Sequence, residues 1–275
     1  MLPKDQARRG WNPIEQASIR PRAVQPTKAG SVALRGWSVL ETDHVTTSGS
    51  SSAFAGFRFP PKVITVAVRW YLRYGLSYRD VEELLAERGV TGDHVSVHRW
   101  VQRFTAEFIE AAQPCRHSPG DRWFVDETYL KVGGRWRYLY RAIDQHGQVI
   151  DVLASSRRDL AAARMFFTRA LRAGTVPAVV TTDRAPAYPR VLDELIPHAS
   201  HCVEQYANNP VEADHGRLKA RLRPMRGLKR HRSARTVAAG HAFVQNLRRG
   251  HYEIATDEPT RHRLRLAFDE LARAI

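Results

Sequence analysis

The sequence predicts an α/β fold in which a mixed sheet with flanking helices is preceded by an all-α helix-turn-helix domain. Three observations lead to this prediction. Three strand-like segments joined by tight turns begin near residue 122, alternating helical and strand-like segments follow them, and three amphipathic helical segments precede them. The 275 residues, 43% of them hydrophobic, suffice for one large domain or two modest ones.

The helical segments near the N-terminus have clear start and stop signals. Apolar residues recur at helical spacing over residues 57–74, 78–88 and 94–108. Ser77 is a predicted N-cap, with Asp80 at the capping-box position three residues later. A glycine-containing turn separates the second helix from the third, which is typical of a helix-turn-helix.

The third of these helices exposes polar side chains that could contact DNA. Such side chains reach base edges and phosphates when a recognition helix enters a groove. The candidates are His94, Ser96, His98, Arg99, Gln102 and Arg103. The alternative is a small three-helix bundle that binds no DNA.

The strand signals begin after Pro119 and Gly120. Residues 123–132 are a strand candidate, and Gly133-Gly134 is a two-residue hairpin turn. The elements expected after the turn are strands at 135–144 and 148–155, a helix at 159–173, a strand at 178–182, a helix at 187–196, a strand at 201–204 and a helix from Asn209 onward. The order βββ-α-β-α-β-α indicates a mixed sheet with helices on both faces.

Charge is the most informative bulk property. Lys and Arg number 43 against 28 Asp and Glu, which gives a net charge of +15. An excess of this size favours a polyanionic partner such as nucleic acid. Cys115 and Cys202 form neither a zinc-type pair nor a disulfide framework. No apolar run approaches the ~18–20 residues that span a bilayer, and the first nine residues lack the apolar stretch of a signal peptide.

Composition divides the chain into segments. Residues 1–52 show no persistent periodicity and are expected to be a disordered extension. We expect a helix-turn-helix DNA-binding domain over 53–110, a linker over 111–121, a catalytic domain over 122–252 and a C-terminal tail over 253–275.

Two aspartates occupy positions that favour chemistry over structure. Asp126 interrupts an apolar strand, where β propensity disfavours Asp and a lone buried carboxylate would be costly. Its neighbour Glu127 would lie on the opposite strand face. Asp183 follows a short strand at its carboxyl end, where ligands gather in α/β sheets. The alternatives are a solvent-facing Asp126 and a turn or N-cap Asp183.

Glu212 has a strong structural explanation beside the functional one. With Asn209 as N-cap and Pro210 at the first helical position, Glu212 would be a capping residue. Lys219 lies two turns further and projects from nearly the same side. A carboxylate for metal and a lysine for phosphate on one helix face would suit a DNA site. His215 lies between them and could contact the DNA or pack against the sheet.

Basic residues crowd the chain beyond Glu212. A solvated surface would normally interleave acids with them. The residues from Arg217 to Arg235 therefore predict a surface that follows phosphates. Its members are Arg217, Lys219, Arg221, Arg223, Arg226, Lys229, Arg230, Arg232 and Arg235. Ser233 is the expected N-cap of a last helix that carries Val237, Phe243, Val244 and Leu247.

These stretches together resemble one known family. The chain is similar to the DDE transposases of bacterial insertion sequences of the type-six group. The matching motifs are Trp123–Asp144, Thr181–Pro189, Tyr206–Lys219 and Arg223–Arg235, and the helix-turn-helix matches over Val68–Val101. Several long motifs in the right order make the resemblance specific.

The resemblance implies a ribonuclease-H-like catalytic core in which Asp126, Asp183 and Glu212 are the catalytic, metal-binding triad. It implies Mg²⁺ as cofactor with Mn²⁺ as a substitute, and cleavage of element ends to free 3′-OH groups that are joined to target DNA. It makes Lys219 the basic residue seven positions after the glutamate. The expected partners are terminal inverted repeats, target DNA and further copies of the chain, in the bacterial cytoplasm at the nucleoid, with no membrane association.

Two features depart from the group. Glu212 follows Asp183 by only 29 residues, so we expect a trimmed loop near residues 197–203. The 1–52 extension lies outside the resemblance. Two other classes of protein remain open at this point. One is a ribonuclease-H-like nuclease without strand transfer, and the other is a DNA-binding regulator without catalysis.

Overall fold

The computed structural model describes residues 52–204, 207–225 and 227–275. Its first elements are the three helices of the expected helix-turn-helix: α1 (Pro61–Arg73), α2 (Tyr78–Ala86) and α3 (His94–Ala112). The Ser77–Asp80 capping box at the start of α2 is present in both directions. Apart from Ser52, the expected disordered extension lies outside the described residues.

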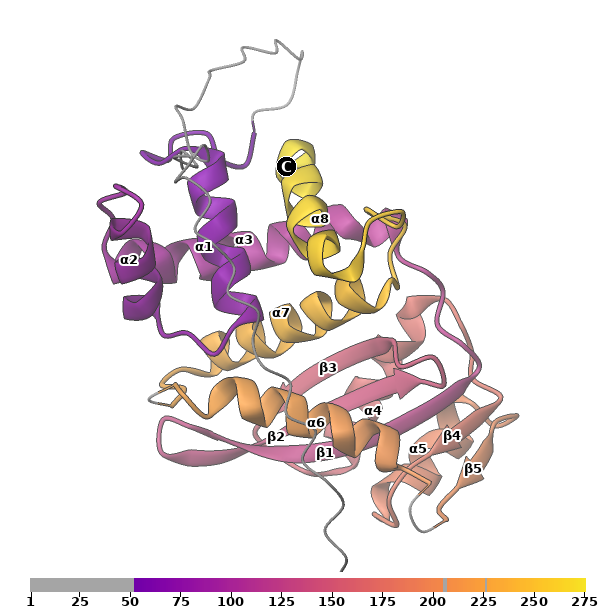
Figure 1. Ribbon diagram of the computed structural model, residues 1–275. Coiled ribbons are helices and arrows are strands. Elements are labelled where there is room, and N and C mark those ends of the chain that lie inside the picture. The colour runs from indigo at the N-terminus through magenta and orange to yellow at the C-terminus, as the bar shows by residue number, and fades with distance from the viewer. Residues whose placement is uncertain (1–51, 205–206, 226) are drawn as a thin grey trace, which may run out of the picture. The chain divides into compact units, whose positions relative to one another are not determined.

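A five-stranded mixed sheet follows the helices (Figure 1). Its strands are β1 (Arg122–Val132), β2 (Arg135–Asp144), β3 (Val149–Ser155), β4 (Val179–Thr181) and β5 (Ser200–Cys202). The spatial order is β3-β2-β1-β4-β5. The first three strands are antiparallel, and β4 and β5 run parallel to β1. This topology confirms the mixed, ribonuclease-H-like sheet expected from the order of elements.

Helices cover both faces of the sheet, as predicted. Helices α4 (Leu160–Ala170) and α5 (Ala187–Leu195) pack on one face, with the short 3₁₀ turn η2 (Leu171–Ala173) after α4. Helices α6 (Asn209–Leu222) and α7 (His231–Arg249) pack on the other. The alternation along β1 follows from this arrangement, because Trp123 and Val125 belong to the α4–α5 core whereas Leu130 and Val132 belong to the other.

The hairpin between β1 and β2 sets the register of the sheet. Gly133 and Gly134 have φ values of +57° and +78°, which a two-residue turn of this kind requires and which glycine adopts without strain. Val132 therefore pairs with Arg135, and six positions back Asp126 pairs with Arg141. Directly paired residues of antiparallel strands share a face, so both side chains lie on the α6–α7 side of the sheet.

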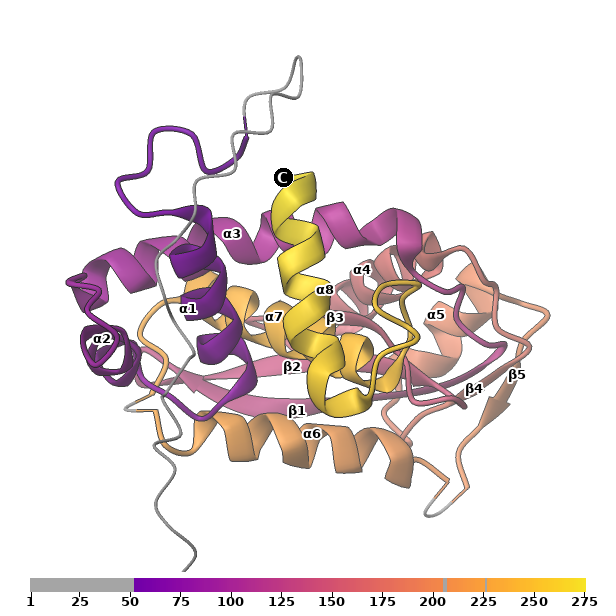
Figure 2. The same cartoon turned by 45° about the horizontal axis from the view of Figure 1, so that its top comes forward.

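The last helix differs from the expected C-terminal tail. Residues 260–274 form α8 (Thr260–Ala274), which buries Leu264, Phe268 and Leu271. In Figure 2, α8 stands beside α1 and in front of α3 and α7, and it packs against all three. The apolar residues recur at helical spacing, and α8 is stable because its partners offer an apolar surface. Helix α3 also extends past the expected end to Ala112, and η1 (Gln113–Cys115) follows it.

Two predicted helix caps are wrong. The N-cap of α6 is Asn208 rather than Asn209, and its side chain makes no cap bond. Its Nδ2 donates to the Val125 carbonyl of β1, 2.9 Å away, and its Oδ1 has no partner among the described residues. The N-cap of α7 is Arg230, and Ser233 lies inside the first turn. At α6 the contact of Asn208 with β1 overrides the local capping preference.

Candidate active site

The three predicted carboxylates come from three neighbouring elements, two adjacent strands and a helix that packs on one of them. Asp126 lies in the middle of β1 and its side chain is 19% exposed. Asp183 follows the end of β4, the strand next to β1. Glu212 lies in the first turn of α6 and is exposed. The charges of Asp183 and Glu212 both act on Asp126, so the three groups share one electrostatic neighbourhood.

Asp126 is the most perturbed acid of this neighbourhood. Burial, followed by the charge of Glu127 and the charges of Asp183 and Glu212, raises the pKa of its carboxyl to about 7. The backbone N–H of Glu127 opposes the shift but does not cancel it. The negative charge gathered here is unfavourable without a cation, which is the electrostatic condition for a divalent metal site.

Arg158, which sequence reasoning missed, connects Asp183 to the far side of β1. Its guanidinium donates to Asp183 Oδ2 at 2.8 Å and forms an ion pair with Glu127. Glu127 also accepts a hydrogen bond from the Tyr188 hydroxyl of α5, so it lies on the opposite strand face from Asp126, as predicted. The other oxygen of Asp183 accepts from the backbone N–H of Ala185. The only signal for Arg158 in the sequence is its place just after β3.

Glu212 is free of the capping role that competed with a functional one. The N-cap at Asn208 moves Glu212 to the fourth helical position, beyond the capping-box site. Within the described residues its carboxylate takes part in no hydrogen bond or ion pair.

The donor set suits a hard cation, although it is not closed into a cage. Carboxylate oxygens are the ligands that Mg²⁺ prefers. Among residues 52–204, 207–225 and 227–275, no three His, Cys, Asp or Glu side chains are arranged as a metal-holding group. Asp183 is engaged by Arg158, and Asp126 lies 3.6 Å from His215 Nδ1. The chemistry of the three acids and the raised pKa of Asp126 fit a divalent metal.

His215 is buried between α6 and the sheet. Burial, with the positive charges of Arg141 and Lys219, lowers the pKa of its imidazole to about 3, so the ring is neutral at pH 7. Its Nε2 has no hydrogen-bond partner among the described residues. Lys219 lies one turn further along α6, on the same side of the helix as His215.

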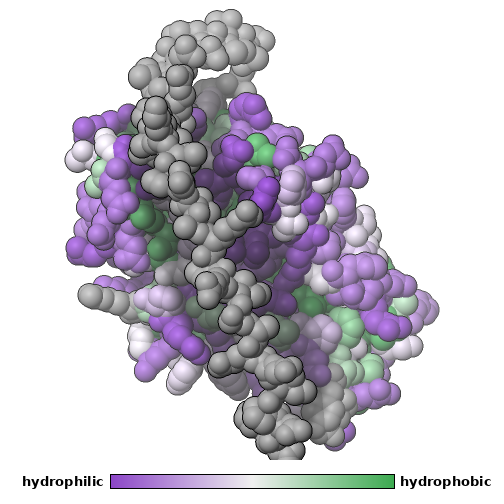
Figure 3. Space-filling model, viewed as in Figure 1, coloured by the Kyte–Doolittle hydropathy of each residue, from purple (hydrophilic) through white to green (hydrophobic). Residues whose placement is uncertain are grey.

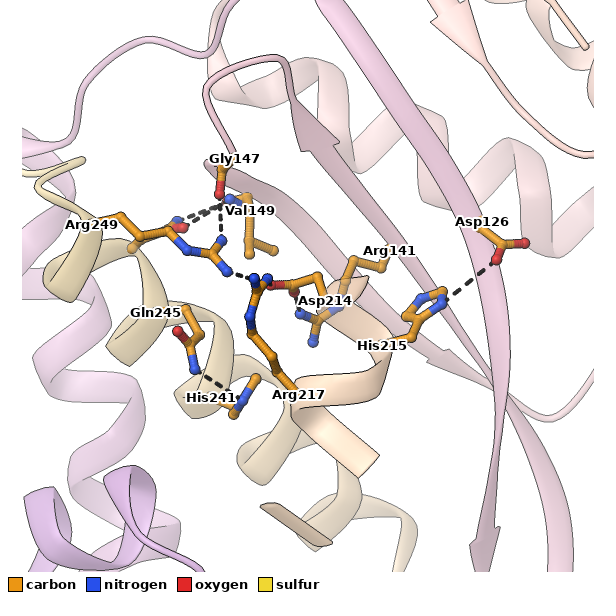
Figure 4. Close-up of polar contacts among 11 residues, drawn as sticks. Asp126, Arg141, Gly147, Val149, Asp214, His215, Arg217, His241, Gln245 and Arg249 are labelled. Atoms are coloured by element: carbon orange, nitrogen blue, oxygen red, sulfur yellow. Dashed lines mark hydrogen bonds and ion pairs between the residues drawn. The ribbon is translucent and has the colours of Figure 1, made fainter. Parts of the chain in front are cut away.

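Asp214 forms the centre of a buried ionic cluster that holds α6 on the sheet (Figure 4). Asp214 and Arg141 are both inaccessible to solvent and form an ion pair. Asp214 also pairs with Arg249 of α7 at 2.6 Å and with Arg217 at 3.4 Å. Burial would raise the pKa of Asp214, but the charges of Arg141 and Arg249 outweigh it and hold the pKa at about 2.

A second contact fixes the far end of α6. Arg221, buried near the C-terminal end of the helix, donates to the Tyr71 carbonyl of α1 and lies 4.8 Å from the centre of the Tyr71 ring. Asn208 attaches the first turn to β1 and Asp214 attaches the middle to β2 and α7. Helix α6 is therefore held along its length, which positions Glu212 and His215 relative to Asp126.

The predicted phosphate contacts of α6 are exposed. Lys219 and Arg223 line a hollow of about 210 Å³ beside the β1–β2 hairpin. Tyr129 and Lys131 of β1 line the same hollow. Arg217 is 54% exposed although it also pairs with Asp214. On the face that carries α6, hydrophilic residues make up much of the visible surface (Figure 3).

The predicted DNA contacts of α3 have different surroundings. Arg99 is exposed. His94 lies 3.1 Å from Glu82, and Arg103 pairs with Glu107 on its own helix at 3.2 Å. His98 packs edge-on against the Tyr78 ring, and burial together with the charges of Arg230, Arg232 and Arg99 lowers its pKa. Of these four, Arg99 is the least constrained by partners.

The β3-β2-β1-β4-β5 sheet, with acids on β1, after β4 and on α6, defines a ribonuclease-H-like polynucleotidyl transferase. A family model described as a DDE domain matches residues 120–251. The transposase of the insertion sequence-like element IS431mec of Staphylococcus aureus is 40% identical over 169 residues, 60% of this chain and 75% of that protein. The transposase of element IS257 in transposon Tn4003, also from Staphylococcus aureus, is 39% identical with the same coverage. The chain belongs to the DDE transposases of bacterial insertion sequences.

Solved structures with similar cores include retroviral integrases. The catalytic core domain of HTLV-2 integrase, in complex with magnesium, covers 47% of this chain and 87% of that one, at a TM-score of 0.39 and 20% identity. The core domain of BIV integrase covers 47% and 84%, at a TM-score of 0.35 and 14% identity. Among the described residues, no helix is long and apolar enough to cross a membrane.

His241 provides a pH test of the core beside the ionic cluster. This residue of α7 is 3% exposed, and burial followed by the charge of Arg141 lowers its pKa to about 3. Because the unfolded chain takes up a proton near pH 6.5 and the folded chain does not, stability is lost as pH falls below 6.5. Between pH 7 and 5 the wild-type protein should lose about 2 kcal/mol of unfolding free energy through His241. His241→Gln should not show this part of the loss when unfolding is measured in urea.

The matched control is His198→Gln, which removes an exposed imidazole just after α5. Its stability should change with pH as the wild-type protein's does. Unfolding free energies of wild type and His241→Gln that run parallel between pH 7 and 5 would contradict the assignment of this pH dependence to His241.

Proposed function

We propose that this transposase binds the ends of an insertion sequence, cleaves them to free 3′-OH groups and joins these to target DNA by two-metal phosphoryl transfer. The observation that carries the proposal is that Asp126 of β1, Asp183 after β4 and Glu212 of α6 share one electrostatic neighbourhood in a chain of the DDE transposase family. Burial and the charges of Glu127, Asp183 and Glu212 also raise the pKa of Asp126. An acid kept at this cost in the middle of a strand is explained by a cation that binds it.

Asp126, Asp183 and Glu212 would hold the metal, Mg²⁺ or Mn²⁺ in its place. When bound, a metal pair would stabilise the attacking and leaving oxygens of an in-line displacement at phosphorus. The chain's own contribution is positioning. The Asp214 cluster orients α6, and Arg158 orients Asp183. Lys219 would bind a phosphate of the DNA beside the reacting group.

The helix-turn-helix would recognise the element ends. In this proposal α3 enters a groove, with Arg99, His94, His98 and Arg103 near bases or phosphates, while Arg217 and Arg223 of α6 follow the backbone. Residues 53–110 are the proposed DNA-binding domain and residues 122–252 the catalytic one. Because two ends must be brought together, the working form is a dimer or larger, acting on DNA at the nucleoid in the bacterial cytoplasm.

A strand-transfer assay tests the proposal. A labelled duplex that ends in the element's terminal repeat is mixed with unlabelled plasmid, with Mg²⁺, Mn²⁺ or EDTA. The expected result is labelled plasmid with either metal and none with EDTA. Cleavage without joining would instead select a nuclease. Binding without any metal-dependent cleavage would select a DNA-binding regulator.

A further inference from the structure

A hollow of about 520 Å³ lies outside the candidate active site, where α1, the end of α7 and the start of α8 meet. Figure 2 shows α1 and α8 side by side. No carboxylate lines the hollow. Five arginines do: Arg69, Arg73, Arg248, Arg261 and Arg265.

The positive charge in this hollow is largely unbalanced. Of the five arginines, Arg265 alone has an ion pair within the described residues, with Asp269 at 3.4 Å. Burial lowers the pKa of Arg69 although the charge of Asp269 opposes the shift, and burial with the charges of Arg73 and Arg249 lowers the pKa of Arg248. Cations crowded together in a partly buried place favour the arrival of an anion.

The position of Arg248 relates the hollow to the candidate active site. Arg248 and Arg249 are consecutive at the end of α7. Arg248 lines the hollow, whereas Arg249 pairs at 2.6 Å with Asp214, on the helix that carries Glu212. The end of α7 therefore contributes one arginine to the hollow and the next arginine to the cluster that holds α6.

The shape of the hollow supports a phosphate backbone as its occupant. The arginines come from three helices and are spread around an open depression, so that several can each meet one phosphate. Guanidinium groups pair with phosphate through two parallel hydrogen bonds. Tyr74, 51% exposed at the rim with Arg73 5.1 Å from its ring centre, adds a surface for sugar or base contact.

We propose that this arginine hollow is a second DNA site, which binds phosphodiester groups of duplex DNA beyond the segment held at α6. Binding there is independent of base sequence because the guanidinium groups meet phosphates, and phosphate contacts carry no base information. It rests on the proposed function only in taking DNA as the substrate. Binding is measured without metal, so that failure of catalysis and failure of this site give different results.

The test compares DNA affinity over a range of salt. Wild type and Arg73→Gln/Arg261→Gln are titrated onto a labelled duplex of arbitrary sequence by fluorescence anisotropy, with EDTA, between about 50 and 200 mM NaCl. Loss of two phosphate contacts should reduce the slope of log affinity against log salt by about 2 and weaken binding about tenfold or more. Arg73→Lys/Arg261→Lys, which keeps both charges, should retain most of the slope.

The matched control is Arg172→Gln/Arg190→Gln, which removes two exposed arginines from η2 and α5. Its slope of log affinity against log salt should stay within about 0.5 of the wild-type slope. The proposal is overturned if both glutamine pairs change the slope equally, or if the lysine pair loses as much as the glutamine pair. It is also overturned if inorganic phosphate displaces the duplex far better than chloride of equal ionic strength, since the hollow would then be a site for free phosphate.

Discussion

Replacing Asp126 with asparagine should abolish strand transfer while leaving the protein folded and able to bind DNA. Asparagine keeps the shape and removes the charge that would bind the metal. Loss of metal-derived stabilisation of about 4 kcal/mol in the transition state corresponds to a rate lower by about 10³-fold. The measurement is the rate of appearance of labelled plasmid in the strand-transfer assay, at saturating Mg²⁺.

The same substitution should not reduce stability. The Asp126 carboxyl has a raised pKa, about 7, so its charge opposes folding as pH rises from the acid range through 7. Without metal at pH 7.5, Asp126→Asn should therefore unfold at a urea concentration no lower than wild type does. Asp193→Asn, an exposed aspartate of α5, is the matched control and should transfer strands normally. Full joining activity in Asp126→Asn would exclude Asp126 as a metal ligand.

Removing the charge of Asp214 should cause the largest loss of stability. Asp214→Asn leaves the guanidinium of Arg141 inaccessible to solvent and without its counter-charge, which typically costs about 3–5 kcal/mol. Because α6 loses its central attachment, joining activity should fall as well. The free energy of unfolding is measured in urea at pH 7. The low pKa of Asp214, about 2, means that the wild-type pair persists at any pH well above that value.

A paired substitution separates the buried charge from other effects of the mutation. In Arg141→Met/Asp214→Leu neither buried charge remains, and Arg249 can still donate to the Gly147 carbonyl or turn to solvent. We expect this double variant to be more stable than Asp214→Asn, because apolar pairs replace buried ion pairs with little loss. Glu258→Gln, which removes an exposed carboxylate just before α8, is the control for the loss of one negative charge. A double variant no more stable than Asp214→Asn would contradict the assignment.

Local patterns in the sequence were enough for most of the fold. The Ser77–Asp80 capping box, the Gly133-Gly134 hairpin and the alternation about Asp126 each depend on neighbours within a few residues, so they survive folding unchanged. The caps at Asn209 and Ser233 were mispredicted, because a capping preference is worth only about 1 kcal/mol and does not by itself fix where a helix starts. At α6 the bond from Asn208 to β1 outweighs that preference.

The sequence by itself determined the fold class, the transposase family and the three candidate acids, because strand and helix periodicity and long motifs lie in contiguous stretches. Only the tertiary structure decided what surrounds those acids. Arg141 meets Asp214 across 73 positions of the chain, and Arg158 meets Asp183 across 25. The arginine hollow likewise joins α1 to α8. Such contacts depend on strand register and helix packing, and charged residues far apart in a basic sequence carry no local sign of which partner each will find.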